Sequence, residues 1–284
     1  MYPILKISEL FAIPTYLLII SLDCILILLI SNKRLGSERF AYLNLKTGLD
    51  LSLIILISGL IGGRLGHILF EYPQIYLSNP LQIFNIFHGG FVFYGGLIFA
   101  VFSSIIFLKF KKDTFLKWAD FFSPLIALGY SVGRLGCFLA GCCYGKPVNT
   151  SIIPWSMINH ALNDGISRHP TQLYASLFEL IIVAILFKFE KNKFDNHIAL
   201  NSKVNLTITS SIRSKFKLSG VIFFSWLTMH GLARLFLEYF RGDFRGSLVL
   251  GTSISSVISI LLILISISNL ILIVKHKKTA YDYA

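Results

Sequence analysis

The chain has 284 residues, of which 55% are hydrophobic and only 14% are charged. A mean hydropathy of +0.71 excludes an ordinary soluble domain and favours an all-α protein that crosses a membrane several times. The net charge of +12 raises the question of nucleic acid, but the placement of the basic residues argues for membrane topology and no nucleic-acid partner.

Seven apolar segments are long enough to cross a bilayer, which takes about 20 residues per helix. They lie at about 11–31, 48–70, 91–108, 118–140, 170–187, 218–240 and 248–274. The first lacks a strongly basic start and a small-residue cleavage site, so we interpret it as a retained helix. No room is left for a second domain, and residues 1–284 are predicted to form a single polytopic membrane domain.

Most of the 26 Lys and Arg residues follow the first, third, fifth and seventh segments. The positive-inside rule then predicts an outside N-terminus and a cytoplasmic C-terminus. It makes 71–90 and 141–169 outer loops, and 188–217 a basic, solvated cytoplasmic loop. The excess charge also suits contact with anionic membrane lipids.

Several of the remaining arginines lie within the spans or at their outer ends, where topology does not require a cation. They are Arg64, Arg134, Arg168, Arg234, Arg241 and Arg245. This asymmetry predicts an anionic ligand near the outer leaflet.

The first two segments carry polar side chains near their outer ends. Tyr16 has two interpretations: a residue of the interfacial aromatic belt, or part of a site. Arg64 lies among glycines spaced Gly59/Gly63 and Gly62/Gly66, a pattern that lets helices approach closely. Arg64 is therefore expected to point into the bundle.

Two glycine pairs, at 89–90 and 95–96, flank the start of the third segment, with Tyr94 between them. Glycine pairs are poor helix formers. They indicate broken or closely approached backbone, which is tolerated at membrane depth only where it is buried or lines a cavity. A packing turn with an interfacial Tyr94 and a functional Tyr94 are both open.

The stretch 129–147 begins as an apolar helix with Arg134 inside it and then passes three cysteines, Cys137, Cys142 and Cys143. A charged residue within a span is a functional-site hypothesis by default. Arginine offers a planar fork of donors that suits a phosphate or carboxylate. The alternative is an arginine that extends to the headgroups or pairs with a buried acid.

The fifth and sixth segments bring further polar groups. His169, Gln172 and Tyr174 place three polar side chains at the membrane entrance of the fifth. In the sixth, polar residues recur on one helix face, which should meet a cavity or other polar groups rather than lipid. They are His230, Arg234, Glu238 and Arg241, and Arg234 and Glu238 are spaced to pair within the helix.

Together these pieces resemble the prolipoprotein diacylglyceryl transferase family of bacterial membrane enzymes. The resemblance covers most of the chain, and its motifs occur in family order. They are IPTY at 13–16, GGRLG at 62–66, the two glycine pairs, GRLG at 133–136, HPTQLY at 169–174, and Arg234, Glu238, Arg241 and Asp243.

The resemblance implies transfer of a diacylglyceryl group from phosphatidylglycerol to the lipobox cysteine thiol of a prolipoprotein signal peptide, with release of glycerol 1-phosphate. It implies no cofactor, and it places the protein in the bacterial cytoplasmic (inner) membrane with an active site open to the outer leaflet. Arg134 and Arg241 would bind the lipid phosphate and stabilise the leaving group.

The resemblance assigns supporting roles to further residues. Tyr16, His169 and Gln172 would shape the headgroup site, and Arg64 would contact substrate. Arg234 and Glu238 would act as a supporting pair. Tyr94 is the candidate proton acceptor, because an acceptor thiol must be deprotonated to react.

The sequence departs from the family pattern at several positions. Tyr94 replaces the usual His, Cys137 an Asn, Cys142 a Glu, Ala175 an acid, and His67 a Tyr. Either the positive field lowers the thiol pKa, aided by Tyr94, His67 or His88, or the chain is a phospholipid-binding relative without this activity.

The cysteines support two further interpretations. A membrane thiol oxidoreductase would use Cys137, Cys142 and Cys143, and a structural disulfide would join two of them. A metal site is not predicted, because zinc takes about four ligands and no fourth is evident.

Overall fold

The computed structural model describes residues 4–8, 11–71, 73–84, 90–160, 162–203, 219–243, 248–249 and 252–282. Within them, seven helices are long and apolar enough to cross a membrane, which confirms the predicted fold class. These helices are α1 (Thr15–Leu35), α2 (Leu45–Gly66), α4 (Phe93–Phe110), α5 (Phe115–Ala140), α6 (Thr171–Lys203), α8 (Val221–Phe240) and α9 (Ile254–Asp282).

Shorter elements connect the helices. Three two-stranded antiparallel ribbons pair β1 with β2, β3 with β4, and β5 with β6. Their strands are β1 (Ile4–Ser8), β2 (Phe11–Pro14), β3 (Met157–Ile158), β4 (Ser167–Arg168), β5 (Leu248–Val249) and β6 (Thr252–Ser253). The remaining helical turns are η1 (Glu38–Phe40), η2 (His67–Glu71), α3 (Pro73–Ser78) and η3 (Pro80–Phe84).

The structure corrects two predicted boundaries. Residues 11–14, assigned to the first helix, form β2, and helix α1 begins at Thr15 after Pro14. Much of the predicted loop 188–217 is helical, since α6 continues to Lys203; residues 204–217 lie outside the described part of the chain. Apolarity alone missed both, because residues 11–14 are as apolar as a span and the end of α6 is as polar as a loop.

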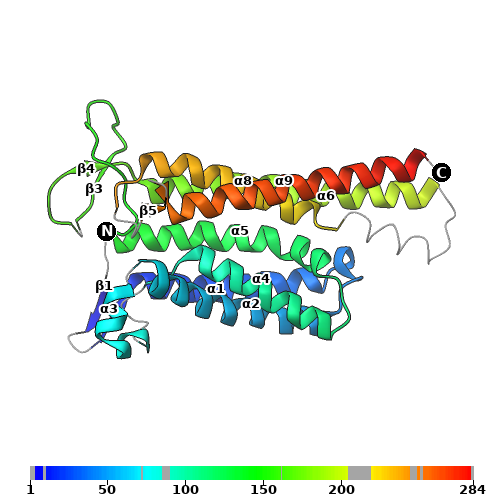
Figure 1. The fold of residues 1–284 in the computed structure, drawn as a ribbon, viewed down its shortest axis with the longest axis horizontal. Helices are drawn as coiled ribbons and strands as arrows, with labels where there is room; N and C mark the ends of the chain where they lie inside the picture. The colour runs from blue at the N-terminus through cyan, green and yellow to red at the C-terminus, as the bar shows by residue number, and fades with distance from the viewer. Residues whose placement is uncertain are drawn as a thin grey trace.

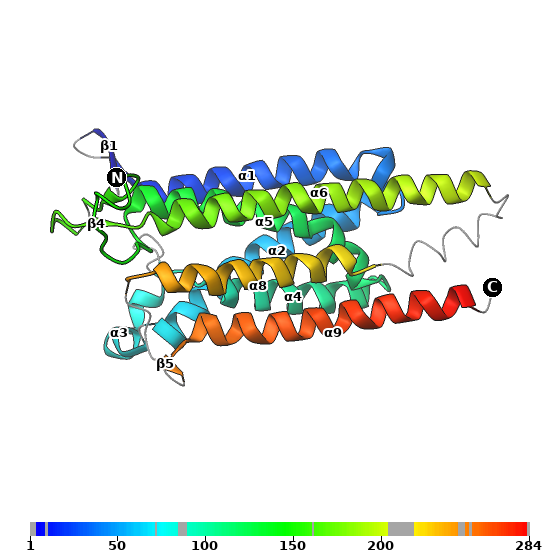
Figure 2. The ribbon, with the colours of Figure 1, turned by 90° about the horizontal axis from the view of Figure 1, so that it is seen from above.

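Helix α5 is the centre of the bundle. It contacts α1, α4, α6 and α8, and Figure 1 shows it between α1, α2 and α4 on one side and α6, α8 and α9 on the other. The short strands and α3 gather at one end of the bundle, where the chain begins, and the C-terminus lies at the opposite end (Figures 1 and 2).

Asp120 fixes helix α8 against α5. Its carboxylate accepts hydrogen bonds from the backbone N–H groups of Gly220 and Phe223, each at 2.9 Å. These N–H groups belong to the first turn of a helix and have no partner within it. A buried acid on α5 thus caps α8 and fixes the start of α8 against α5.

Helices α2 and α4 touch through glycines. A Cβ on Gly62 would lie 2.6 Å from the Gly95 carbonyl oxygen, and a Cβ on Gly95 would lie 2.5 Å from that of Gly62. The second glycine pair is therefore part of a continuous helix, and it marks close backbone approach, one of the two predicted meanings.

This contact predicts a large difference between two similar substitutions. Gly95→Ala should lower the thermal unfolding midpoint in detergent, because overpacking of this kind costs about 1–3 kcal/mol. Gly59→Ala is the matched control, since nothing lies within 4 Å of its added Cβ. Equal midpoints for the two variants would contradict the contact.

Candidate functional site

Arg134 lies on the last two turns of α5 and has donor capacity to spare. Its Nη2 donates to the Tyr130 hydroxyl at 2.6 Å, and its guanidinium lies 4.5 Å from the centre of that ring. In the described part of the chain, no carboxylate lies within ion-pair distance of Arg134. The predicted alternative of a buried acid partner is therefore not found there, and the open donors can take an anion.

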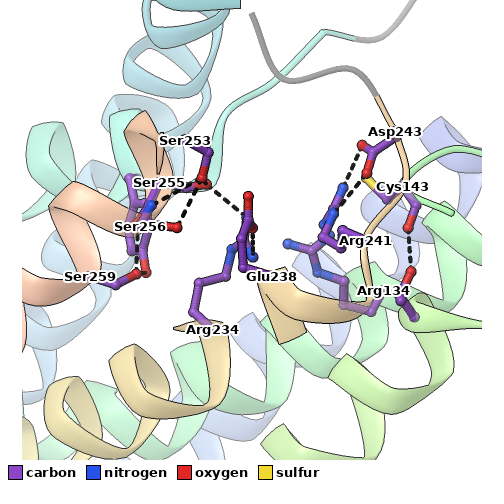
Figure 3. Close-up of polar contacts among 12 residues, drawn as sticks. Arg134, Cys143, Arg234, Glu238, Arg241, Asp243, Ser253, Ser255, Ser256 and Ser259 are labelled. Atoms are coloured by element: carbon purple, nitrogen blue, oxygen red, sulfur yellow. Dashed lines mark hydrogen bonds and ion pairs between the residues drawn. The ribbon is translucent and has the colours of Figure 1, made fainter. Parts of the chain in front are cut away.

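Arg241 follows the last residue of α8 and lies next to Arg134 (Figure 3). It binds Asp243 through two hydrogen bonds, of 2.9 and 2.7 Å. Burial opposes its charge, but the nearby Cys143 thiol and the Asp243 carboxylate outweigh burial and raise the pKa of Arg241. Two neighbouring guanidinium groups, of which only Arg241 pairs with a carboxylate, that of Asp243, form an electropositive site that suits a phosphate.

Three thiols lie beside these arginines. The Sγ atoms of Cys137, Cys142 and Cys143 are all within 4.8 Å of one another, and all three cysteines are free. Hydrogen bonds with the other two thiols, together with Arg241 and Arg134, lower the pKa of Cys143. The approach of Cys137 to the other two thiols could not be predicted from the sequence, because it depends on how the chain turns after α5.

That turn is built from left-handed backbone and buried side chains. Gly141 has φ of 75° and Cys143 has φ of 61°, a conformation that is unusual for a residue other than glycine. The carbonyls at 141, 142 and 143 each accept one side-chain hydrogen bond. The donors are Asn159 at 2.7 Å, Gln172 at 2.6 Å and Thr171 at 2.7 Å, respectively.

Gln172 is thus placed behind the cysteine loop. It is only 1% exposed, and its amide nitrogen donates a hydrogen bond to the Cys142 carbonyl. Asn159 and Thr171 likewise donate hydrogen bonds to carbonyls of this loop. Neither was predicted from the sequence, because a buried polar residue in a loop has no periodic pattern.

This arrangement predicts the effect of removing one hydroxyl. Thr171→Val keeps the shape of the side chain but leaves the Cys143 carbonyl without its donor, which should cost about 1–3 kcal/mol. We expect a lower thermal midpoint and faster alkylation of Cys143. Thr150→Val, at an exposed loop position, is the control and should match the parent protein in both measurements.

Arg234 and Glu238 form a second polar group one turn below, as their spacing predicted. They pair at 2.6 Å, and Arg234 also donates to the Ser255 hydroxyl at 2.8 Å. Figure 3 shows serines of β6 and α9 gathered around this pair. The Tyr94 hydroxyl hydrogen bonds with one of them, Ser259, at 2.6 Å.

A model of the family described as prolipoprotein diacylglyceryl transferase matches residues 3–272 of this chain. The chain belongs to the prolipoprotein diacylglyceryl transferase family. Several relatives carry the name phosphatidylglycerol–prolipoprotein diacylglyceryl transferase. A protein of Bordetella parapertussis is 31% identical over 256 residues, which cover 89% of this chain and 88% of the relative. One of Clostridium botulinum is 32% identical over 234 residues, covering 81% and 82%.

Family membership confirms the predicted resemblance and, with the seven helices, a multi-pass membrane protein. It favours the transferase interpretation over the lipid-binding and thiol-oxidoreductase alternatives. The departures from the family pattern therefore occur within a chain that belongs to the transferase family.

Tyr16 and His169 both lie near the arginines' end of the bundle. Tyr16, on the first turn of α1, packs against the position of Gly136 and is within electrostatic range of Arg134 and the three thiols. His169 lies beside Gly145, and its Nδ1 is 3.3 Å from the Tyr174 hydroxyl. Burial, and then the charge of Lys146, lower the pKa of His169, which favours its neutral form.

Arg64 has a different environment. It is buried, and its guanidinium donates to the backbone carbonyls of Gln82, Ile83 and Gly90 at 2.7, 3.2 and 3.3 Å. It points into the protein, as predicted, but it ties down the segment between α2 and α4. Its role in substrate binding is a prediction that these contacts do not support. His88, named above as an aid to deprotonation, lies outside the described residues.

A buried network behind Arg134 was not predicted. The Glu179 carboxylate accepts one hydrogen bond from Trp226 Nε1, at 2.9 Å, and pairs with His230 Nδ1 at 3.0 Å. The His230 ring meets the Tyr130 ring edge-on, with centres 4.7 Å apart. The network therefore supports the tyrosine that holds Arg134. The helical stripe contained His230, but the sequence could not name its partner on α6.

Proposed function

We propose that this chain transfers a diacylglyceryl group from phosphatidylglycerol to the lipobox cysteine thiol of prolipoproteins and releases glycerol 1-phosphate. The observation that carries the proposal is Arg134, a guanidinium without a carboxylate partner in the described residues, beside Arg241. Its donors suit the phosphodiester of the lipid. The family assignment and the names of the relatives support the same reaction.

In the proposed reaction the acceptor thiolate attacks the glycerol carbon that bears the phosphate. A carbon–sulfur bond forms, the carbon–oxygen bond to phosphate breaks, and the phosphate leaves with the bonding electron pair. Arg134 and Arg241 stabilise the charge that develops on the leaving oxygen. The same positive field favours the thiolate form of the acceptor.

The thiol proton needs an acceptor, and Tyr94 is our candidate. A neutral phenol can accept a proton only if it passes its own onward. The 2.6 Å contact with Ser259 provides the first partner for such a relay, and the glycerol phosphate that leaves as a dianion is the final acceptor of the proton. Tyr16 and His169 would border the headgroup, and the Arg234–Glu238 pair would support the site from α8.

We further propose that the protein lies in the bacterial cytoplasmic membrane with this site opening to the outer leaflet. The support is charge placement: the site lies at the end of the bundle opposite the C-terminus (Figure 1), and most lysines follow helices that end at the other side.

Reconstitution tests the transferase proposal. The purified chain is mixed with phosphatidylglycerol and a lipobox peptide, and the peptide is examined by mass spectrometry. We expect a diacylglyceryl thioether on the cysteine and none on a peptide with serine in its place. A folded protein that binds phosphatidylglycerol but forms no thioether would reject the proposal in favour of a lipid-binding relative.

A further inference from the structure

The three-cysteine cluster offers a set of soft ligands that the transfer reaction does not use. Cys137 comes from the last turn of α5, and Cys142 and Cys143 come from the loop that follows. All three sulfurs lie within 4.8 Å of one another. Thiolates at this spacing select soft metal ions, chiefly Cu(I) and Zn²⁺.

The number of ligands decides between these ions. In a planar three-ligand site, metal–sulfur bonds of about 2.3 Å place the sulfurs about 4 Å apart, so small side-chain rotations would close the cluster on an ion. Among the described residues, no fourth His, Cys, Asp or Glu joins the group. Structural zinc sites take four ligands, whereas Cu(I) accepts three thiolates.

The loop is held in shape by residues outside the cluster. Asn159, Thr171 and Gln172, all at most 3% exposed, bind the three consecutive carbonyls of 141–143. The thiols are therefore brought together before any ion binds, which reduces the entropy cost of binding. Cys142 is exposed, Cys143 half-buried and Cys137 buried, so one side of the cluster is open to an incoming ion.

The surrounding charge suits an anionic metal–thiolate complex. Cu(I) with three thiolates carries a net charge of minus two. Arg134 has no carboxylate partner in the described residues, and Arg241 shares its charge with Asp243 (Figure 3). The two guanidinium groups offset part of the negative charge that the complex would otherwise leave partly buried.

We propose that Cys137, Cys142 and Cys143 form a three-coordinate binding site for Cu(I). Binding exchanges the thiol protons for one cation, and these protons pass to solvent. Neither copper nor sulfur changes oxidation state.

Copper binding is measured on the purified full-length chain in detergent, reduced and kept without oxygen. Cu(I) is supplied as its coloured bicinchoninate complex. We expect the chain to withdraw one Cu(I) per molecule. Cys137→Ser, Cys142→Ser and Cys143→Ser should each weaken binding at least about 100-fold, whereas Cys24→Ser, on α1, should bind like the parent. Substoichiometric uptake, or equal loss in Cys24→Ser, would overturn the proposal.

A measurement on the unmutated protein guards against variants that fail to fold. Cu(I) should slow alkylation of Cys142 and Cys143 by N-ethylmaleimide at least about tenfold, and leave the rate at Cys24 unchanged. Peptide mass spectrometry reads each site. Unprotected cysteines, or Zn²⁺ that displaces Cu(I) at equal concentration, would refute a three-coordinate copper site.

A consequence for activity rests on the proposed transferase function. Copper-loaded protein should transfer lipid more slowly, because the complex draws on the arginines assigned to the phosphate. Cys142→Ser protein should lose the copper sensitivity, measured against its own transfer rate without copper. Since copper uptake is measured without lipid or peptide, failure of the transferase proposal would leave the binding result standing. Equal inhibition of Cys142→Ser protein would show that copper acts elsewhere.

Discussion

Arg134→Ala is expected to reduce diacylglyceryl transfer about 10³-fold, the upper range for removing a single charge-stabilising donor group. The alanine leaves the departing phosphate without a guanidinium that has no carboxylate partner in the described residues. It also leaves the Tyr130 hydroxyl without its 2.6 Å partner. The readout is the rate of thioether formation on a lipobox peptide.

The size of the loss separates catalysis from simple attraction of an anionic lipid. Arg134→Lys keeps the charge but lacks the planar fork, so we expect partial activity. Arg168→Ala is the matched control: it removes the same charge, but the Arg168 guanidinium already pairs with a carboxylate, that of Asp164, at 2.9 Å. Normal transfer by Arg134→Ala protein, or a comparable loss in Arg168→Ala protein, would contradict the assignment.

The features that could be predicted from sequence are those set by the lipid environment and by the regular spacing of residues along a helix. A span must be apolar and about 20 residues long, so all seven helices were found. The glycines of α2 and α4 also predicted a close contact between two helix backbones, because only glycine leaves room for such an approach. The β1–β2 ribbon was missed, since apolar residues in a short strand and in the first turn of a span have the same composition.

The sequence predicted the charged residues of the site but not the hydrogen bonds and contacts that hold them in place. Arg134 and the Arg234–Glu238 pair follow from the cost of charge in lipid and from helical spacing. Gln172 was expected to shape the headgroup site, and its hydrogen bond to the Cys142 carbonyl is a connection that the sequence did not indicate. The thiol cluster depends on left-handed backbone at Cys143, which a sequence signals at glycine but not at cysteine.

The Arg234–Glu238 pair provides the second large effect. Glu238→Leu should destabilise the protein by about 3–5 kcal/mol, because it leaves a buried guanidinium without its carboxylate. Arg234 is only 6% exposed, and the Ser255 hydroxyl is a neutral partner. We expect a marked fall in the thermal unfolding midpoint in detergent.

The double variant Arg234→Met with Glu238→Leu tells structure from function. Replacing both partners by apolar side chains removes the uncompensated charge, so the thermal midpoint should return most of the way to that of the parent. The rate of diacylglyceryl transfer by the double variant should nevertheless be lower than that of the parent if the pair supports the site that holds the phosphate. A double variant that recovers both stability and transfer would reduce the pair to a packing element. One that recovers neither would show that Arg234 and its serine neighbours hold α8 against α9 independently of Glu238.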